Sequence, residues 1–75
     1  MSNLELAVRQ HFDGYSANFL ATFSLGEIMQ SFFWNSDLED TSWVADTYEV
    51  ASDASLSSEE LTEFEEIYSR LIKDK

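Results

Sequence analysis

The chain has 75 residues, of which 44% are hydrophobic and 15% aromatic, and its formal net charge is −11. This length fits one small domain, residues 1–75, and the apolar content excludes a disordered acidic tail. The absence of cysteine excludes disulfides, thiolate metal sites and a cysteine nucleophile. No run of about 18 apolar residues is present, so no membrane-spanning helix is expected.

The start of the chain has no basic segment followed by an apolar run, so no signal peptide is predicted. A surface this acidic should repel anionic membranes and nucleic acid, so we expect direct binding to neither. A cytoplasmic location is therefore expected, in the cytoplasm of the host cell if the source is viral. A homodimer is a further possibility, because a domain this small buries little surface area on its own.

The first two segments are predicted to be helical. Residues 2–12 have apolar side chains at helical spacing, and Ser2 with Glu5 has the spacing of a capping box. Gly14 suits the left-handed turn that ends a helix. Residues 16–23 fit either one helical face or a short strand, because they are rich in aromatic residues, and helix is preferred.

The segment from Ser24 to Trp34 is predicted to form the most buried helix. Ser24 and Glu27 again have capping-box spacing. Apolar residues then fall on more than one side of the helix: Leu25, Ile28, Met29, Phe32 and Phe33. We expect the Phe-Phe-Trp cluster that ends this segment to pack in the core. An exposed aromatic patch for a partner is the alternative.

Residues 35–41 are polar and predict a loop. A further helix is expected to begin at Asp40 or Thr41. Its apolar side is expected to consist of Trp43, Val44, Tyr48 and Ala51. A strand over residues 43–50 stays open, because tryptophan, valine, threonine and tyrosine favour pleated structure.

The last helix is the clearest element of the sequence. Ser57 and Glu60 form a capping box at its start. A continuous apolar stripe follows: Leu61, Phe64, Ile67, Tyr68, Leu71 and Ile72. Glu66 and Arg70 have the spacing of a helical ion pair. Together the segments predict an all-α fold, a small compact bundle of about four short helices.

No arrangement of side chains predicts catalysis. His11 lies on the apolar side of its helix without an obvious base or nucleophile partner, so a packed imidazole is expected. Gly14 and Gly26 are the only glycines, too few for a phosphate-binding loop. Calcium-loop spacing begins at Asn35, but Asp40 occupies the sixth position, where that loop needs glycine. The sequence therefore predicts no enzyme, no cofactor and no metal site.

Carboxylates dominate the middle of the chain. Between Gln10 and Ser69 there are thirteen of them and no lysine or arginine. Acids three or four positions apart on a helix lie about 5–6 Å apart, and two predicted helices carry such rows, which loop acids could extend. The candidate partner-binding residues are Asp37, Glu39, Asp40, Asp46, Glu49, Asp53, Glu59, Glu60, Glu63 and Glu66.

Such rows could imitate the phosphates of DNA, which carries one negative charge per about 1.7 Å of duplex axis. A lysine- and arginine-lined groove responds to the charge and not to its source. The sequence therefore predicts a small acidic inhibitor that blocks the basic nucleic-acid-binding surface of a partner protein. Exposed aromatic residues at the rim, Trp34, Trp43 or Tyr48, could stack on arginine.

In length, charge and helical pattern, the chain resembles the small acidic inhibitors of phages and plasmids that mimic DNA, which include some anti-restriction and anti-CRISPR proteins. The resemblance implies an anti-defence role and covers no motif, so no residue role is transferred. The alternative is an acidic helical adaptor or regulatory module that binds its partner through an apolar groove. A homo-oligomeric structural subunit and acidity for solubility alone are the remaining interpretations.

Overall fold

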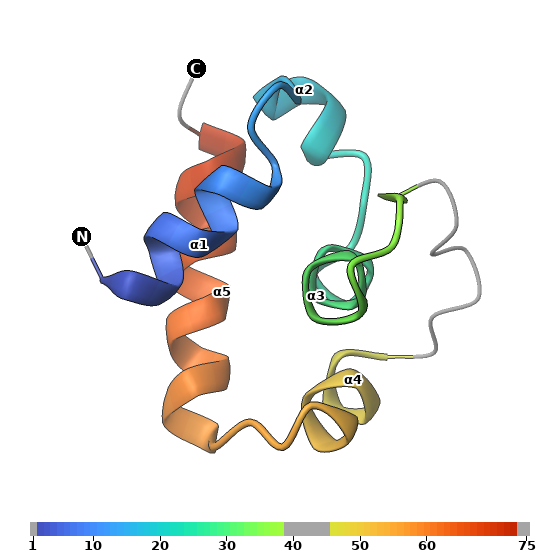
Figure 1. Ribbon diagram of the computed structural model, residues 1–75, viewed down its shortest axis with the longest axis vertical. Helices are drawn as coiled ribbons and strands as arrows, with labels where there is room; N and C mark the ends of the chain where they lie inside the picture. Colours follow the sequence, from blue (N-terminus) through green and yellow to red (C-terminus); the bar gives the residue numbers. More distant parts are fainter. Residues whose placement is uncertain (1, 39–45, 74–75) are drawn as a thin grey trace.

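The computed structural model describes residues 2–38 and 46–73. Within these residues the chain forms five helices and no strand: α1 (Asn3–His11), α2 (Ala17–Leu20), α3 (Leu25–Trp34), α4 (Thr47–Asp53) and α5 (Ser58–Lys73). In Figure 1, α5 runs along one side of the molecule, α1 and α2 lie near its C-terminal part, and α4 lies near its N-terminal end. The helix α3 packs against α4 and α5. The predicted all-α fold is confirmed.

Serine and aspartate side chains cap the helix starts. Hydroxyl oxygens of Ser2, Ser16 and Ser24 accept hydrogen bonds from backbone N–H groups three residues later, at 3.1, 3.1 and 3.2 Å. The predicted box of Ser24 is reciprocal, because the Glu27 carboxylate accepts from the Ser24 N–H at 2.9 Å. Such caps satisfy backbone donors that lack a partner within the helix and contribute ~1 kcal/mol each.

The turn after α1 and the end of α3 use left-handed backbone. Gly14 has a φ of 97°, and a Cβ added there would meet nothing within 4 Å, so conformation and not space favours glycine. Asn35 ends α3 with a φ of 52°, a conformation that asparagine tolerates better than most residues. Both positions agree with the predicted helix ends.

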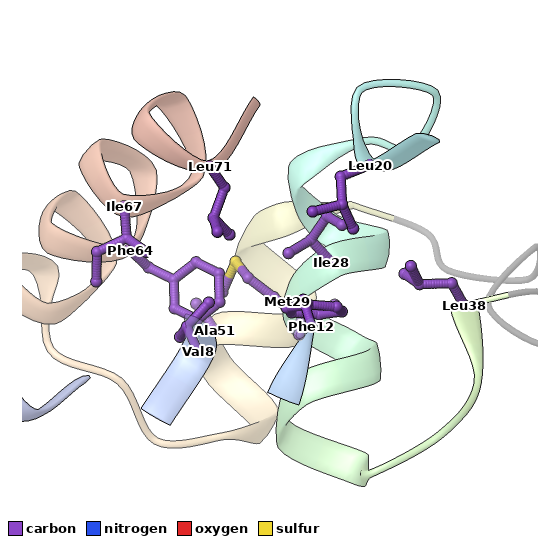
Figure 2. Packing of buried hydrophobic residues seen from close by; sticks show 11 residues of the cluster. Val8, Phe12, Leu20, Ile28, Met29, Leu38, Ala51, Phe64, Ile67 and Leu71 are labelled. Atoms are coloured by element: carbon purple, nitrogen blue, oxygen red, sulfur yellow. The ribbon is translucent and has the colours of Figure 1, made fainter. Parts of the chain in front are cut away.

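The core lies between α3 and α5. Phe64, Ile28 and Met29 are fully buried, and Figure 2 shows side chains of α1, α3 and α5 converging there. The ring centroid of Phe64 lies 5.8 Å from that of Phe32 and 5.6 Å from that of Phe33. Each fully buried side chain of this kind contributes about 1.5–3 kcal/mol. The apolar residues predicted on several sides of α3 thus hold the bundle together.

Two aromatic residues expected on apolar sides are exposed, which agrees instead with the alternative of exposed rings at Trp34 and Tyr48. Trp34, expected in the core, is 46% exposed at the last position of α3. Tyr48, expected on the apolar side of its helix, is 77% exposed, whereas Val50 and Ala51 are buried. For Tyr48 the cause is the helix start: Asp46 caps α4 by accepting from the Glu49 N–H at 2.9 Å, so the helix begins at Thr47.

The position at which α4 begins also tests the alternative of a strand over residues 43–50. Residues 47–50 are helical, so the strand expected as an alternative over 43–50 is wrong for that part. Trp43 and Val44 lie outside the described residues. The ambiguous segment 16–23 contains a helix, but α2 covers only Ala17–Leu20.

One buried carboxylate connects the two ends of the sequence. The Glu5 side chain is 6% exposed and accepts hydrogen bonds from Arg9 Nε and Nη2 at 3.1 and 2.9 Å. It also accepts from Arg70 Nε and Nη2 at 3.1 and 2.6 Å, which ties α1 to α5. Glu5 therefore does not complete the predicted capping box with Ser2, and Arg70, expected to pair with Glu66, binds Glu5.

The Arg70 hydrogen bonds hold the pKa of Glu5 at about 2, against an ordinary value of 4.5; burial opposes this shift and Arg9 supports it. Because the folded pKa is the lower one, the ion pair stabilises the fold fully above pH 4.5 and loses this effect as the pH falls toward 2.

We expect the E5Q variant to melt several degrees below the native chain at neutral pH, because its arginines lose their buried counter-charge. The difference should shrink as the pH falls from 4.5 toward 2, measured by circular dichroism at each pH. E66Q, at an exposed position of α5, is the matched control and should show no such convergence. A gap between E5Q and the native chain that stays constant down to pH 2 would contradict this role.

Candidate acidic interface

Among the described residues, acids predominate in α4 and the first half of α5, whereas the bases lie in the last turns of α1 and α5. Residues 46–66, which form α4 and most of α5, contain eight acids and no base. Arg70 and Lys73 lie in the last turn of α5, and Arg9 lies in the last turn of α1. At 1.5 Å per residue, Arg70 lies about 16 Å along the helix from Glu59. Residues 46–66 are therefore called the acidic end (Figure 1).

The acids of α4 form a row of two helical residues. Glu49 and Asp53, four positions apart, lie within one sector of the helix, whereas Asp46, predicted to be in the same helical row, is the extended residue that caps its start. All three are exposed. The buried residues Val50 and Ala51 anchor the helix on α3 and leave this sector facing solvent.

The acids of α5 form a second row. Glu59 and Glu66 are exposed, whereas Glu63 is partly buried. Their spacing of four and three positions places them on one side of the helix, where Glu63 borders the buried Ile67 and Glu59 and Glu66 face solvent. Carboxylates at this spacing are about 5–6 Å apart at their Cβ atoms, which is the predicted geometry for this row.

Two candidate residues also serve the helices themselves. Asp46 caps α4 as described, so its carboxylate is occupied by a backbone N–H. The Glu60 carboxylate accepts from the Ser57 N–H at 3.0 Å, and the Ser57 hydroxyl accepts from the Glu60 N–H at 3.1 Å. The hydrogen bond from the Ser57 backbone lowers the pKa of Glu60. The capping box predicted at Ser57 is thus confirmed.

Of the remaining candidates, the structure describes only Asp37. The segment with Asp37 lies on the other side of α3 from α4 (Figure 1). Glu39 and Asp40 lie outside the described residues. Conversely, Glu65 is exposed within the acidic end and was not among the candidates. Its place in the run of glutamates along α5 was the signal that could have found it.

An aromatic ring is exposed at the acidic end. Tyr48 is one position before Glu49 on α4, and at 77% exposed it is the most exposed large hydrophobic residue of the described chain.

The side chain of His11 is packed: its Nε2 lies 3.2 Å from the Ser31 hydroxyl, and its ring contacts Phe12 and Phe32 edge-on. The Ser31 hydroxyl donates its hydrogen to the Ser36 carbonyl at 2.6 Å. In the contact between His11 and Ser31, the His11 Nε2–H is therefore the donor and the Ser31 oxygen the acceptor.

Among the described residues, no set of three or more histidines and carboxylates is arranged to hold a metal ion. None of the helices in that part of the chain combines the length and apolarity needed to cross a bilayer. Comparison with protein-family models, with curated proteins and with solved structures finds no match to this chain.

We expect added NaCl to raise the melting temperature, because it shortens the range of repulsion among the acids from about 10 Å at 0.1 M to about 3 Å at 1 M. KCl at equal ionic strength should act equally, since screening depends on ionic strength. The check is a series of melting curves. A flat or falling melting temperature in moderate NaCl would show that repulsion within the acidic end is not significant.

Proposed function

We propose that this protein is a small acidic inhibitor that occupies the basic nucleic-acid-binding surface of another protein. The observation that supports this most is the distribution of charge: eight acids and no base in residues 46–66, which span two consecutive helices. A lysine- and arginine-lined groove would meet carboxylates spaced along α4 and α5 where it normally meets phosphates. Inhibition then requires competition for the groove and no catalytic step.

The three basic residues that the structure describes all lie outside residues 46–66. Arg9 and Arg70 both bind Glu5, and Lys73 lies at the far end of α5. Electrostatic steering should therefore draw a cationic partner to the acidic end and give rapid, salt-sensitive association. An anti-defence role, in which the partner is a nuclease that cleaves invading DNA, is the setting we propose for such an inhibitor.

The adaptor function is the second candidate, and exposed aromatic residues favour it. Tyr15 and Phe19 are 43% and 39% exposed on the side of α2. A partner held there by apolar contacts would bind with weak salt dependence, whereas binding through the acidic end should weaken strongly at 0.5 M salt. A salt titration of binding therefore separates the two functions.

Reversing the charge of the α5 row should abolish inhibition. The variant E59K/E63K/E66K replaces three carboxylates with cations that a basic groove repels, so it should no longer displace DNA from its target. The measurement is DNA binding by a basic nuclease or regulator captured from lysate at low salt, titrated with each variant. Unchanged inhibition by the triple variant would contradict the proposal.

A matched comparison keeps the net charge constant. E59K/E66K and D13K/D37K change the charge by the same amount at exposed positions, but only the first pair lies at the acidic end. We expect E59K/E66K to weaken inhibition far more than D13K/D37K. Equal loss in both would mean that overall charge, and not the row on α5, determines binding.

Tyr48 should add contact energy by stacking on a partner arginine. Such cation–π contacts contribute about 0.5–1 kcal/mol at exposed sites, so Y48A should weaken inhibition roughly two- to fivefold. Y48F keeps the ring and should bind like the native chain. If Y48A also binds like the native chain, the ring does not contact the partner.

A further inference from the structure

A ladder of aromatic rings runs from the end of α1 across α2. The ring centroids of Phe12 and Tyr15 are 6.3 Å apart. Those of Tyr15 and Phe19 are 5.4 Å apart and nearly parallel at 13°. Phe23 meets Phe19 edge-on at 5.2 Å. The middle rings, Tyr15 and Phe19, remain 43% and 39% exposed, so the side of the stacked pair that faces away from the core contacts solvent.

A hollow lies beside this pair, between α1, α2 and the end of α5. Its volume is about 300 Å³. Its lining consists of Arg9, Phe12, Asp13, Gly14, Tyr15, Ala17, Leu20 and Leu71. Tyr15 belongs to both features, so the exposed rings and a hollow with a mostly polar lining are neighbours on one surface. We call this surface the aromatic face.

The aromatic face lies where the charges of the molecule cancel. Residues 2–27, together with the last turns of α5 up to Lys73, carry three acids and three bases: Glu5, Asp13, Glu27, Arg9, Arg70 and Lys73. The net charge of −11 therefore arises elsewhere in the chain. Two copies can approach each other at this end without the repulsion that would oppose any contact between their acidic ends.

We propose that the aromatic face binds a second copy of this chain. A two-fold contact needs a surface that is complementary to itself, and exposed rings beside a hollow provide one, because the rings of each copy can enter the hollow of the other. A cationic protein would be attracted to the acidic end instead. In the proposed dimer the two acidic ends point away from each other. The distance between them then exceeds the screening length of about 8 Å at physiological salt, so their mutual repulsion is largely screened.

The dimer is tested by analytical ultracentrifugation of the native chain over a concentration series. We expect a reversible monomer–dimer equilibrium, and we expect Y15S/F19S to raise the dissociation constant at least tenfold. Y48S removes a still more exposed ring, from the acidic end, and should leave the constant unchanged. Circular dichroism of each variant establishes that it is folded. If Y15S/F19S unfolds, Asn18→Arg, which places a bulky cation at an exposed position between the rings, replaces it.

Two results would overturn the proposal: a native chain that sediments as a monomer at every concentration, or a dimer that persists in both aromatic-face variants. The dimer is independent of the proposed inhibitor function, and salt separates them. Dimerisation through a face with no net charge should persist or strengthen in 0.5 M NaCl, whereas binding of a basic partner should weaken. Likewise, E59K/E63K/E66K should dimerise normally even if it no longer inhibits.

Discussion

The hydrogen-bonded ion pair between Glu5 and two arginines is the contact on which the arrangement of the molecule depends. A chain with fifteen acids and four bases has few cations with which to close its fold. Two of those four, Arg9 and Arg70, bind one carboxylate that is 6% exposed. Leaving either a buried acid or its partners uncompensated destabilises a fold strongly, so this contact fixes α1 against α5. Both arginines are thus engaged outside residues 46–66, which contain no base.

Most of the fold could be predicted from the sequence, because its signals are local. Serine caps and apolar stripes locate α1, α3 and α5, and each depends on residues within about one or two turns. The start of α4 could not be predicted in the same way. The apolar residues at 43 and 44 led us to expect the buried side of this helix to include Tyr48. In the structure the helix is capped by Asp46, Val50 and Ala51 are buried, and Tyr48 is exposed. The pairing of Glu5 with Arg70 could not be predicted either, because the two residues are 65 positions apart in the sequence.

The candidate site was predictable in part, for the same reason. Rows such as Glu59, Glu63 and Glu66 follow from helical spacing alone, and the structure places them on one side of α5. Spacing does not show whether a carboxylate is already engaged, and Asp46 and Glu60 bind backbone N–H groups at helix starts. Nor does it show where a loop lies: the segment that follows α3 and contains Asp37 is on the other side of α3 from α4 (Figure 1). The aromatic face was missed because its rings belong to a segment whose fold was ambiguous.

Helix energetics separate the acids that stabilise the fold from those that do not. Acids near a helix N-terminus and bases near its C-terminus stabilise it by about 0.3–1 kcal/mol each. On α5 this rule accounts for Glu59 and Glu60 in the first turn and for Arg70 and Lys73 in the last. On α4 it fails, because Asp53 is the final residue of a helix whose last turn has no base. An exposed carboxylate at the negative end of a short helix weakens that helix. Its presence therefore favours a role in contact with a cationic surface over a role in folding.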